Sequence, residues 1–580
     1  MHSHRGRMGT SCYLIKKRKK MITFNYLLEQ IRLYKKSIII ANILAIVMTL
    51  ISVPVPLFIP HLVDEVILGK EGSFISTVNQ FIEVSSPEYY ILIVFILIII
   101  LFAINSFLGV VRRAYLDKTI ENIRLNMRRK LLTHLKSVSM SEFDMLGSGA
   151  TSSKMGTDIG VVIGFLSSSM GNILVAILKL IAMSVILLYL NWKLALVILI
   201  LNPLVVKVFI KVFKKLSKLM KDRNRTIASF NNSLVESLEL FNQIRVQNRE
   251  EHFFDKVNSD ATKIRDKSYE YDLEWNKSLV VASMLMSYSN TLFQMLALYF
   301  VLLGDMSIGE MMAIFVYAGM IRQPINLLLR FTQKYHDAKE AMDRLNDILN
   351  LKKEQKFKME IDPFKDKETA SIELKNISFA YDENKQIFKD FNLKIEAGEK
   401  VAITGETGSG KSTLANIIMG LYPIDEGEIL YNGVDITKIG YEKVRENIGF
   451  VLQSPLMFNS TLRYNLSLGK EYSDEEMYRV LKIAQLYDFV DELPKKLDTI
   501  VGKNGTKLSG GQRQRLSIAR VLLDRPKVII FDESTSSLDN ETENRLLEAL
   551  DDYIKDKTII TIAHRQTTID TAERVVNLNT

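Results

Sequence analysis

The feature that most constrains the fold is a series of six long apolar stretches before residue 335. Several of them carry no charge over a length that can cross a hydrocarbon core of about 30 Å. An isolated apolar run is often a buried core helix, but six in succession with short outer turns favour membrane-spanning helices. The predicted spans cover residues 37–60, 89–111, 165–190, 194–210, 278–303 and 307–329.

The distribution of charge predicts the orientation of these spans. Positively charged loops stay on the cytoplasmic side of a membrane, because their translocation is disfavoured. Residues 1–20 and 112–130 are rich in basic residues, whereas residues 61–88 hold five acidic residues against one lysine. We therefore expect an integral protein of a bacterial cytoplasmic membrane, with both termini and the C-terminal domain in the cytoplasm.

The N-terminal tail narrows the possible classes of protein. No apolar run with a cleavage site follows it at signal-peptide length, although a transit peptide stays open as an alternative, and Met21 could be the natural start.

The single cysteine, Cys12, excludes an internal disulfide framework and a cysteine-rich metal site. A net charge of +9 would fit nucleic-acid binding, but basic loops beside membrane helices explain this charge better. Nucleic acid is not expected as a partner.

The length of 580 residues is too great for one compact core, so two domains are expected. The inner connections 112–164 and 211–277 have a helical pattern, so the membrane helices should continue far into the cytoplasm. From residue 371 short β-rich runs alternate with helical ones, which is typical of an α/β domain. The predicted organisation is a basic tail over 1–20, an all-α membrane domain of six transmembrane helices over 21–335, a linker over 336–370 and an α/β domain over 371–580.

A glycine-rich loop follows the predicted strand 401–404 and precedes a helical run. In this context it matches the P-loop pattern, whose backbone N–H groups close around phosphate oxygens. Lys411 would reach the β and γ phosphates, and Ser412 would ligate Mg²⁺. ATP and Mg²⁺ are thus the expected cofactors. The nucleotide-binding residues predicted in this loop are Gly405, Glu406, Thr407, Gly408, Ser409, Gly410, Lys411, Ser412 and Thr413.

A second apolar run, 528–531, reads as a buried parallel strand and is followed by Asp532 and Glu533. Adjacent acids at a strand end usually lie in a solvated turn. Together with the upstream P-loop, however, one carboxylate can hold the Mg²⁺ shell while its neighbour orients or deprotonates the attacking water. We assign Asp532 to the metal and Glu533 to the water.

Residues 508–512 read Leu-Ser-Gly-Gly-Gln, and here the sequence resembles the ABC transporter family, whose signature motif this is. The resemblance extends over almost the whole chain and implies an ATPase domain of the ABC type. It implies that Tyr381 stacks on adenine, that Gln453 contacts Mg²⁺ and that His564 lies near the γ phosphate. Asp539 would lie in the loop that meets the partner subunit. The implied contacts of the signature segment to nucleotide come from Ser509, Gly510, Gly511 and Gln512.

The same resemblance implies a shared ATP site. Ser509 and Gly511 would contact the γ phosphate on the P-loop of the opposing subunit, so a dimer of half-transporters is expected. Because the motifs for turnover are all intact, a homodimer is favoured, while a heterodimer with a related half stays open. Lys503 stands where exporters of the family often have an acid, which puts the usual contact there in doubt. The family normally continues beyond the position of Thr580, so a truncated C-terminus is expected.

The membrane half also resembles exporters of this family. Residues 191–195 are similar to the tight outer turn between the third and fourth spans. Residues 142–149 and 241–250 are similar to the two intracellular regions that press on the ATPase domains. The implied function is ATP-driven export or flipping of an amphiphilic substrate, such as a lipid, a peptide or a drug-like molecule, across the membrane by alternating access.

The sequence leaves open two alternatives to the export function and the identity of the cargo. The same architecture could serve a membrane-bound ATPase that regulates without moving cargo, or an importer on an exporter scaffold. Lys179 and Arg322 lie within predicted spans, where a cation is costly and usually faces a cavity or a partner. They favour a cavity that accepts anionic amphiphiles, although such residues also snorkel or bind lipid head groups.

Overall fold

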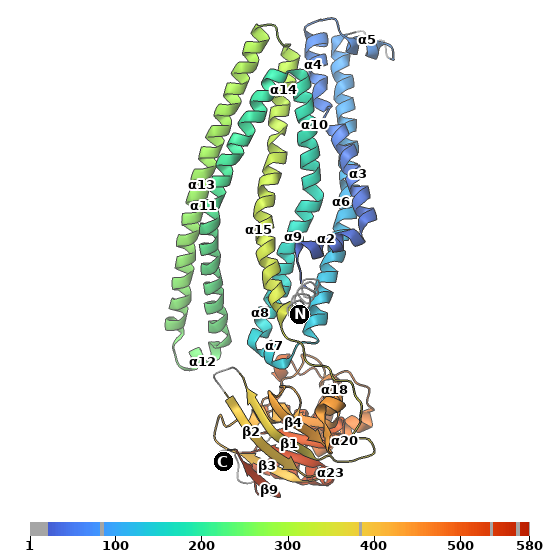
Figure 1. The fold of residues 1–580 in the computed structure, drawn as a ribbon, viewed down its shortest axis with the longest axis vertical. Coiled ribbons are helices and arrows are strands. Elements are labelled where there is room, and N and C mark those ends of the chain that lie inside the picture. Colours follow the sequence, from blue (N-terminus) through green and yellow to red (C-terminus); the bar gives the residue numbers. More distant parts are fainter. Residues whose placement is uncertain (1–20, 82–85, 382–385, 534–537, 564–568, 579–580) are drawn as a thin grey trace, which may run out of the picture. The chain divides into compact units, whose positions relative to one another are not determined.

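The computed structural model describes residues 21–81, 86–381, 386–533, 538–563 and 569–578 (Figure 1). The chain divides into two compact units. One combines Met1–Leu132 with Ser152–Leu349, and the other combines Thr133–Thr151 with Asn350–Thr580. The second unit thus includes a short segment from the first third of the sequence, and this segment contains residues 142–149, which the resemblance expected to press on the ATPase domain.

The first unit is helical, which confirms the predicted helical membrane domain. Four helical stretches in the described part of the chain are long and apolar enough to cross a membrane by length and composition, namely Lys35–Ile67, Pro87–Leu135, Thr151–Leu190 and Glu250–Leu302. The predicted spans 194–210 and 307–329 lie in α11 and in α14 with the start of α15. The helices are α2 (Phe24–Leu33), α3 (Lys35–Ser52), α4 (Phe58–Pro60), α5 (Ser73–Asn79), α6 (Pro87–Leu135), α8 (Ser148–Ser153), α9 (Ile159–Ser168), α10 (Leu174–Leu190), α11 (Trp192–Glu239), α12 (Phe241–Val246), α13 (Glu250–Leu302), α14 (Ile308–Met320) and α15 (Arg322–Asn350).

Several long helices extend well beyond the predicted spans. The fourth and fifth spans, for example, continue into α11 and α13, which lie side by side as an antiparallel pair (Figure 1). The predicted turn between the third and fourth spans is reduced to Asn191, because its side chain accepts a hydrogen bond from Leu194 N and caps α11 from Trp192 onward. The prolines at the outer end of the first span interrupt α3, which is followed by a 3₁₀ turn (Val55–Leu57), α4 and a π-helix (His61–Ile67).

Near the end of the first predicted span, Asp64 of the π-helix joins the start of α14. Its carboxylate accepts hydrogen bonds from Ser307 Oγ and, at 3.3 Å, from Gly309 N. Ser307 also caps α14 in a reciprocal arrangement with Glu310, in which each side chain bonds the other residue's backbone N–H. A Cβ on Gly309 would lie 2.4 Å from Asp64 Oδ2 and 2.6 Å from Pro60 Cα. The close approach of the two segments therefore requires glycine at this position.

The C-terminal part of α15 is held by polar contacts. The Asn346 side chain of α15 donates from Nδ2 to Ile22 O at 2.9 Å and accepts from Ile22 N at 2.7 Å, which fixes the segment before α2. Arg344, two residues earlier, donates from Nη2 and Nε to the buried Asp158 carboxylate at 2.6 and 3.1 Å. Two sequence-distant segments, at Ile22 and at Asp158, are thereby joined to one end of α15.

The second unit contains two sheets, which confirms the predicted α/β domain. A five-stranded parallel sheet has the order β6-β7-β8-β3-β9, and a four-stranded antiparallel sheet has the order β2-β1-β4-β5. The predicted strands 401–404 and 528–531 are β3 and β7, which are largely buried, as expected for a parallel sheet covered on both faces. The strands are β1 (Ile372–Ala380), β2 (Gln386–Ile395), β3 (Lys400–Thr404), β4 (Glu426–Tyr431), β5 (Val434–Asp435), β6 (Ile448–Val451), β7 (Val528–Asp532), β8 (Thr558–Ile562) and β9 (Arg574–Asn577).

Helices pack around the parallel sheet and complete the second unit. One hydrophobic cluster joins both sheets with α16, and another joins β7 with the helices between residues 457 and 523. These clusters fix where the ends of β3, β6 and β7 lie. The helices are α7 (Met140–Leu146), α16 (Lys411–Ile418), α17 (Ile436–Ile439), α18 (Tyr441–Asn447), α19 (Leu462–Ser467), α20 (Asp474–Ile483), α21 (Tyr487–Glu492), α22 (Gly510–Leu523) and α23 (Asn540–Ile554).

Replacement of Gly309 by alanine tests its close approach to Asp64 and Pro60. We expect Gly309→Ala to destabilise the first unit by about 1–3 kcal/mol, because the added methyl group overpacks the contact with Asp64 and Pro60. The measurement is the thermal unfolding temperature of the full chain in detergent. Gly319→Ala is the matched control, since a Cβ there meets nothing within 4 Å. An equal unfolding temperature for both variants would contradict this packing.

Candidate functional site

The loop between β3 and α16 has the geometry of a phosphate cradle. Gly410 caps α16 with φ of 95°, a left-handed conformation that favours glycine. A Cβ at this position would also lie 2.7 Å from Ile387 Cγ2 and 2.9 Å from Phe388 Cζ of β2. Gly405 and Gly408 also have positive φ angles. The loop therefore turns tightly and presents the first N–H groups of α16, where an anion is stabilised.

Two polar side chains of this loop fit a phosphate ligand. Lys411 is buried, and its Nζ donates to Gly405 O at 2.7 Å and to Glu406 O at 2.8 Å, so its charge is held against the loop. Ser409 Oγ is buried and has no hydrogen-bond partner among the described residues. A buried hydroxyl without a partner is costly, and a phosphate oxygen would satisfy it. Ser412 is exposed beside this position, whereas Thr413 is buried.

Tyr381 lies directly beside this loop. Its hydroxyl group is 2.8 Å from Thr413 Oγ1, and the residue is 48% exposed and so accessible to a ligand. Its ring meets the rings of Phe379 and Tyr422 in T-shaped contacts. This arrangement suits a stacking platform for a flat heterocycle.

The ends of β6 and β7 bring three polar residues of the predicted site together. Asp532 is buried at the end of β7, and Glu533 follows with φ of 46°, an unusual backbone conformation for a residue with a side chain. Gln453 Nε2, just beyond β6, donates to Glu533 Oε2 at 2.6 Å. Strain of this kind at a carboxylate is typical of functional positions.

The donor set indicates how a metal could be held. The described residues contain no cluster of three or more His, Cys, Asp or Glu side chains that could bind a metal. A hydroxyl, an amide oxygen and one or two carboxylates, completed by phosphate oxygens, are nevertheless the ligands that Mg²⁺ takes in nucleotide sites. Ser412, Gln453 and Asp532 fit that pattern.

The signature segment begins helix α22. Ser509 Oγ accepts from Gln512 N at 3.1 Å, and Gln512 Oε1 accepts from Ser509 N at 2.8 Å, so the two residues cap the helix reciprocally. Gly510 and Gly511 follow with no side chain to cover the helix N-terminus. One turn further on, Gln514 Nε2 donates to Gln453 O at 3.4 Å. The signature helix therefore contacts the segment that bonds Glu533.

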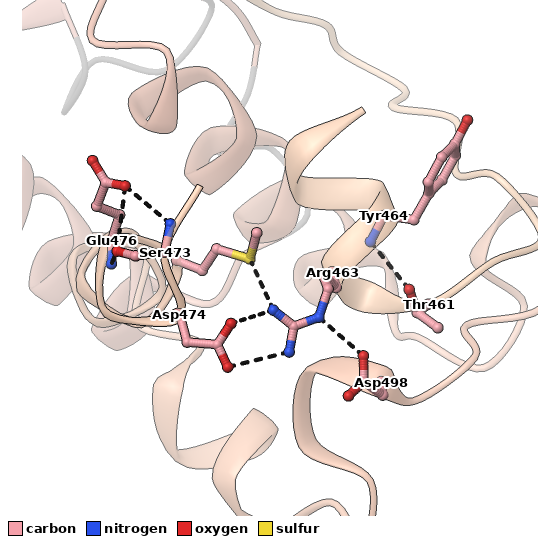
Figure 2. A network of polar contacts seen from close by, with 8 residues as sticks. Thr461, Arg463, Tyr464, Ser473, Asp474, Glu476 and Asp498 are labelled. Atoms are coloured by element: carbon pink, nitrogen blue, oxygen red, sulfur yellow. Dashed lines mark hydrogen bonds and ion pairs between the residues drawn. The ribbon is translucent and has the colours of Figure 1, made fainter. Parts of the chain in front are cut away.

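A network of polar contacts around Arg463 joins α19 to the start of α20 and to Asp498, as Figure 2 shows. The guanidinium of Arg463 bonds both oxygens of Asp474 at the start of α20, and its Nε donates to Asp498 at 3.0 Å. The hydrogen bond from Arg463 holds the pKa of Asp474 below its usual range. Nearby, Leu462 N donates to Thr499 O at 2.9 Å, which joins α19 to the segment that leads to the signature.

Four further residues were predicted from the sequence to have a role, namely Asp539, His564, Lys179 and Arg322. Asp539 caps α23 and accepts from Thr542 N at 2.9 Å, and this backbone hydrogen bond is the main cause of a lowered pKa of Asp539. His564 lies outside the described residues. Lys179 is half-buried within α10, and Arg322 is exposed as the first residue of α15.

Sequence reasoning did not identify Arg463, Tyr422 or the contact made by Asp144. Arg463 is one arginine in a segment without a known motif, and its partners are 11 and 35 residues away. Tyr422 bonds Asp144 across 278 residues of sequence. Only the position of Tyr422, shortly after the P-loop helix, could have drawn attention to it.

Comparison with known proteins agrees with this geometry. Residues 388–536 match the family described as ABC transporter, and residues 38–325 match the ABC transporter transmembrane region. The chain is 30% identical to a multidrug resistance ABC transporter ATP-binding and permease protein of Lactococcus lactis subsp. lactis (strain IL1403), over 93% of this chain and 88% of that protein. It is 32% identical to an ATP-dependent lipid A-core flippase of Haemophilus influenzae (strain ATCC 51907 / DSM 11121 / KW20 / Rd), over 78% and 77%.

A solved structure shares the fold. The structure of a bacterial Atm1-family ABC exporter with ATP bound aligns with a TM-score of 0.76 at 23% identity, over 94% of this chain and 93% of that chain. The order of a helical membrane region and an α/β domain is therefore common to both.

Substitution of Arg463 tests the network of Figure 2. A carboxylate whose pKa is lowered on folding stabilises the fold above its unfolded pKa of about 3.9, and this contribution is lost as the pH falls through the folded value. We therefore expect Arg463→Ala to lower the thermal unfolding temperature at pH 7, and expect the gap to wild type to narrow as the pH falls below about 4.

The matched control for Arg463→Ala is Arg479→Ala, which removes an exposed arginine from the neighbouring helix α20. This variant should unfold close to the wild-type temperature at every pH. A gap for Arg463→Ala that did not change with pH would mean that its ion pairs do not stabilise the unit.

Proposed function

The chain belongs to the ABC transporter family, as an integral membrane protein that hydrolyses ATP, and on that premise we propose that two copies form an exporter of amphiphilic molecules. The observation that carries this proposal is the meeting of a phosphate cradle, a strained carboxylate and a signature helix in the same compact unit. The helical unit that precedes it supplies the membrane path. Its basic inner segments and acidic outer loop support a cytoplasmic location for the ATPase domain.

The residues of this chain divide the chemistry among them. Lys411 would leave the carbonyls of Gly405 and Glu406 to reach the phosphates, and Tyr381 would stack on the adenine ring. Bound Mg²⁺, held by Ser412, Gln453 and Asp532, would neutralise charge on the phosphate oxygens. Glu533, which accepts a hydrogen bond from Gln453 at 2.6 Å, would orient the attacking water and accept its proton. His564 would lie near the γ phosphate.

The proposed dimer follows from the exposed signature. The side chains of Ser509 and Gln512 each accept a hydrogen bond from the other residue's backbone N–H. This leaves the N-terminus of α22, with Gly510 and Gly511, open to an anion from outside the helix. A phosphate on a second subunit's P-loop would fit this position, and Asp539 would face that subunit. A homodimer is favoured because one chain supplies every motif, and a heterodimer with a related half remains the alternative outcome.

ATP can drive a shape change only if it binds one conformation more tightly than the other. A phosphate held between two subunits meets this condition, because the contacts to the second subunit exist only when the two ATPase domains are closed. Closure would open the membrane half outward, and hydrolysis would reset it. The direction of transport is therefore proposed as outward.

The cargo is proposed to be an amphiphile with an anionic group. Relatives named for multidrug resistance and for lipid A-core flipping support an amphiphilic cargo. Lys179 and Arg322 are cations on the membrane helices α10 and α15, where an anion offsets the cost of burial.

Substitution of Glu533 tests the assignment of the water-activating group. Glu533→Gln should lower kcat for ATP hydrolysis by about 100-fold or more while ATP still binds, because the amide cannot accept the proton of water. The measurements are phosphate release and the retention of labelled ATP in lipid nanodiscs. Glu548→Gln, an exposed glutamate of α23, is the matched control and should hydrolyse ATP at the wild-type rate. Normal turnover by Glu533→Gln would remove the assignment.

Transport in inside-out vesicles tests the proposed cargo and direction. The wild-type chain should move a fluorescent anionic phospholipid to the vesicle interior leaflet when ATP is added outside. Lys179→Ala with Arg322→Ala should slow this movement, whereas Lys118→Ala, an exposed lysine of α6, should not. ATP hydrolysis without movement of any probe would favour a regulatory ATPase, and movement in the opposite direction would favour an importer.

A further inference from the structure

The segment Thr133–Thr151 packs with the ATPase domain although it lies in the membrane half of the sequence. It is continuous with α6 and contains α7. Ser139 N donates to Lys352 O at 3.1 Å, Glu354 N donates to Ser137 O at 2.9 Å, and an isolated β-bridge joins Val138 to Lys353. The segment before α7 is therefore fixed to the chain that leads into β1.

The opposite end of α7 makes a different contact. Asp144 Oδ2 accepts a hydrogen bond from the Tyr422 hydroxyl group at 3.1 Å. Burial, and then the neighbouring Asp144 carboxylate, raise the pKa of Tyr422 to about 12, so the phenol keeps its proton at neutral pH and can donate. Gly147, with φ of 76°, ends α7 by donating to Phe143 O at 2.9 Å. Asp144 thus lies on a short helix that is held at both ends.

Tyr422 in turn contacts the aromatic residues beside the P-loop. Its ring is stacked on Phe379 with centroids 5.9 Å apart, and it meets Tyr381 edge-on at 5.7 Å. Tyr381 also packs edge-on against Phe379 at 5.2 Å and lies within hydrogen-bond distance of Thr413 of α16. The three rings therefore form one packed group, and only Tyr381 of the three carries an assigned role in binding nucleotide.

The backbone also joins Tyr422 to the P-loop helix. Leu421 N donates to Asn416 O at 2.9 Å and Tyr422 N donates to the same carbonyl at 3.4 Å, directly after α16. Because α16 begins at Lys411, Tyr422 lies at the far end of the helix whose N-terminus forms the phosphate cradle. Tyr422 thus contacts Tyr381 on the predicted adenine side and is bonded to the C-terminal part of the helix that begins at the phosphate cradle.

We propose that Tyr422 is a positioning residue that ties the nucleotide site to α7 through its hydrogen bond to Asp144. The proposal rests on the proposed function, in which ATP moves the membrane helices. Adenine stacked on Tyr381 would restrict the motion of the Tyr381 ring. Because the Tyr422 ring packs against Tyr381, bound ATP would also favour the orientation of Tyr422 in which its hydroxyl group reaches Asp144. The occupied site would then hold α7, and with it the inner end of α6, in one position.

Single substitutions separate this role from nucleotide binding. Tyr422→Phe keeps the ring stack but removes the donor, and Asp144→Ala removes the acceptor. Each should leave KM for ATP within about twofold, and each should lower the number of fluorescent phospholipids moved per ATP hydrolysed by about threefold to tenfold, the range that a lost hydrogen bond gives. The double variant should lose no more than either single variant, because both remove the same bond.

Further variants make the result specific. Asp144→Asn keeps an acceptor oxygen and should retain most of the coupling, whereas Tyr478→Phe, in α20, should match wild type. A purely structural role of Tyr422 would instead change the unfolding temperature and KM together. Unchanged coupling in Tyr422→Phe and Asp144→Ala, or effects that multiply in the double variant, would overturn the proposal.

A readout without cargo distinguishes this proposal from the proposed function. Addition of ATP to the full chain in nanodiscs should slow hydrogen exchange in residues 140–146, and Tyr422→Phe should remove this protection while ATP still binds. If wild type moves no phospholipid but shows the protection, the proposed function fails and the role of Tyr422 stands. If wild type moves phospholipid and shows no protection that depends on Tyr422, the role of Tyr422 is wrong.

Discussion

The turn between β3 and α16 is the constraint on which the rest of the second unit depends. It must bring the first N–H groups of a helix, a lysine ammonium group and a buried hydroxyl to one point, and this is possible only if residue 410 is left-handed and lacks a Cβ. The turn follows β3, which is paired within the parallel sheet, and β6 and β7 bring Gln453 and Glu533 to the same edge of that sheet. In the sheet order β6-β7-β8-β3-β9, these strands and the strand before the turn all end at the same edge.

The proposed function sets a second constraint, because a change at the ATP site must be passed to helices that belong to the other compact unit. The chain solves this by placing Thr133–Thr151 among the residues of the ATPase domain while leaving it covalently continuous with α6. Hydrogen bonds to Lys352, Glu354 and Tyr422 hold that segment at several points. Because this segment is continuous with α6, the proposed coupling would pass along that helix to the membrane domain.

Local features of this protein followed from its sequence, and long-range ones did not. The strands 401–404 and 528–531, the glycine-rich turn and the helical membrane half could be predicted, because each is encoded by neighbouring residues whose pattern has one physical interpretation. The bond between Tyr422 and Asp144 and the three-way contact of Arg463 depend on segments far apart in sequence. The reduction of the outer turn to Asn191 depended on a single capping hydrogen bond, which residue type alone does not determine. The roles assigned to the residues of the ATP site, from Tyr381 to His564, and to Lys179 and Arg322 remain predictions.

A complementation experiment tests most directly whether each ATP is bound by two chains at once. Lys411→Ala removes the phosphate-binding lysine and Ser509→Arg blocks the signature, and each is combined with Glu533→Gln so that bound ATP is retained rather than hydrolysed. Neither variant alone should retain labelled ATP, whereas a mixture of the two should, because a mixed dimer contains one site with an intact P-loop from one chain and an intact signature from the other. Retention by Ser509→Arg alone, or no recovery in the mixture despite assembly of mixed dimers, would contradict a shared site.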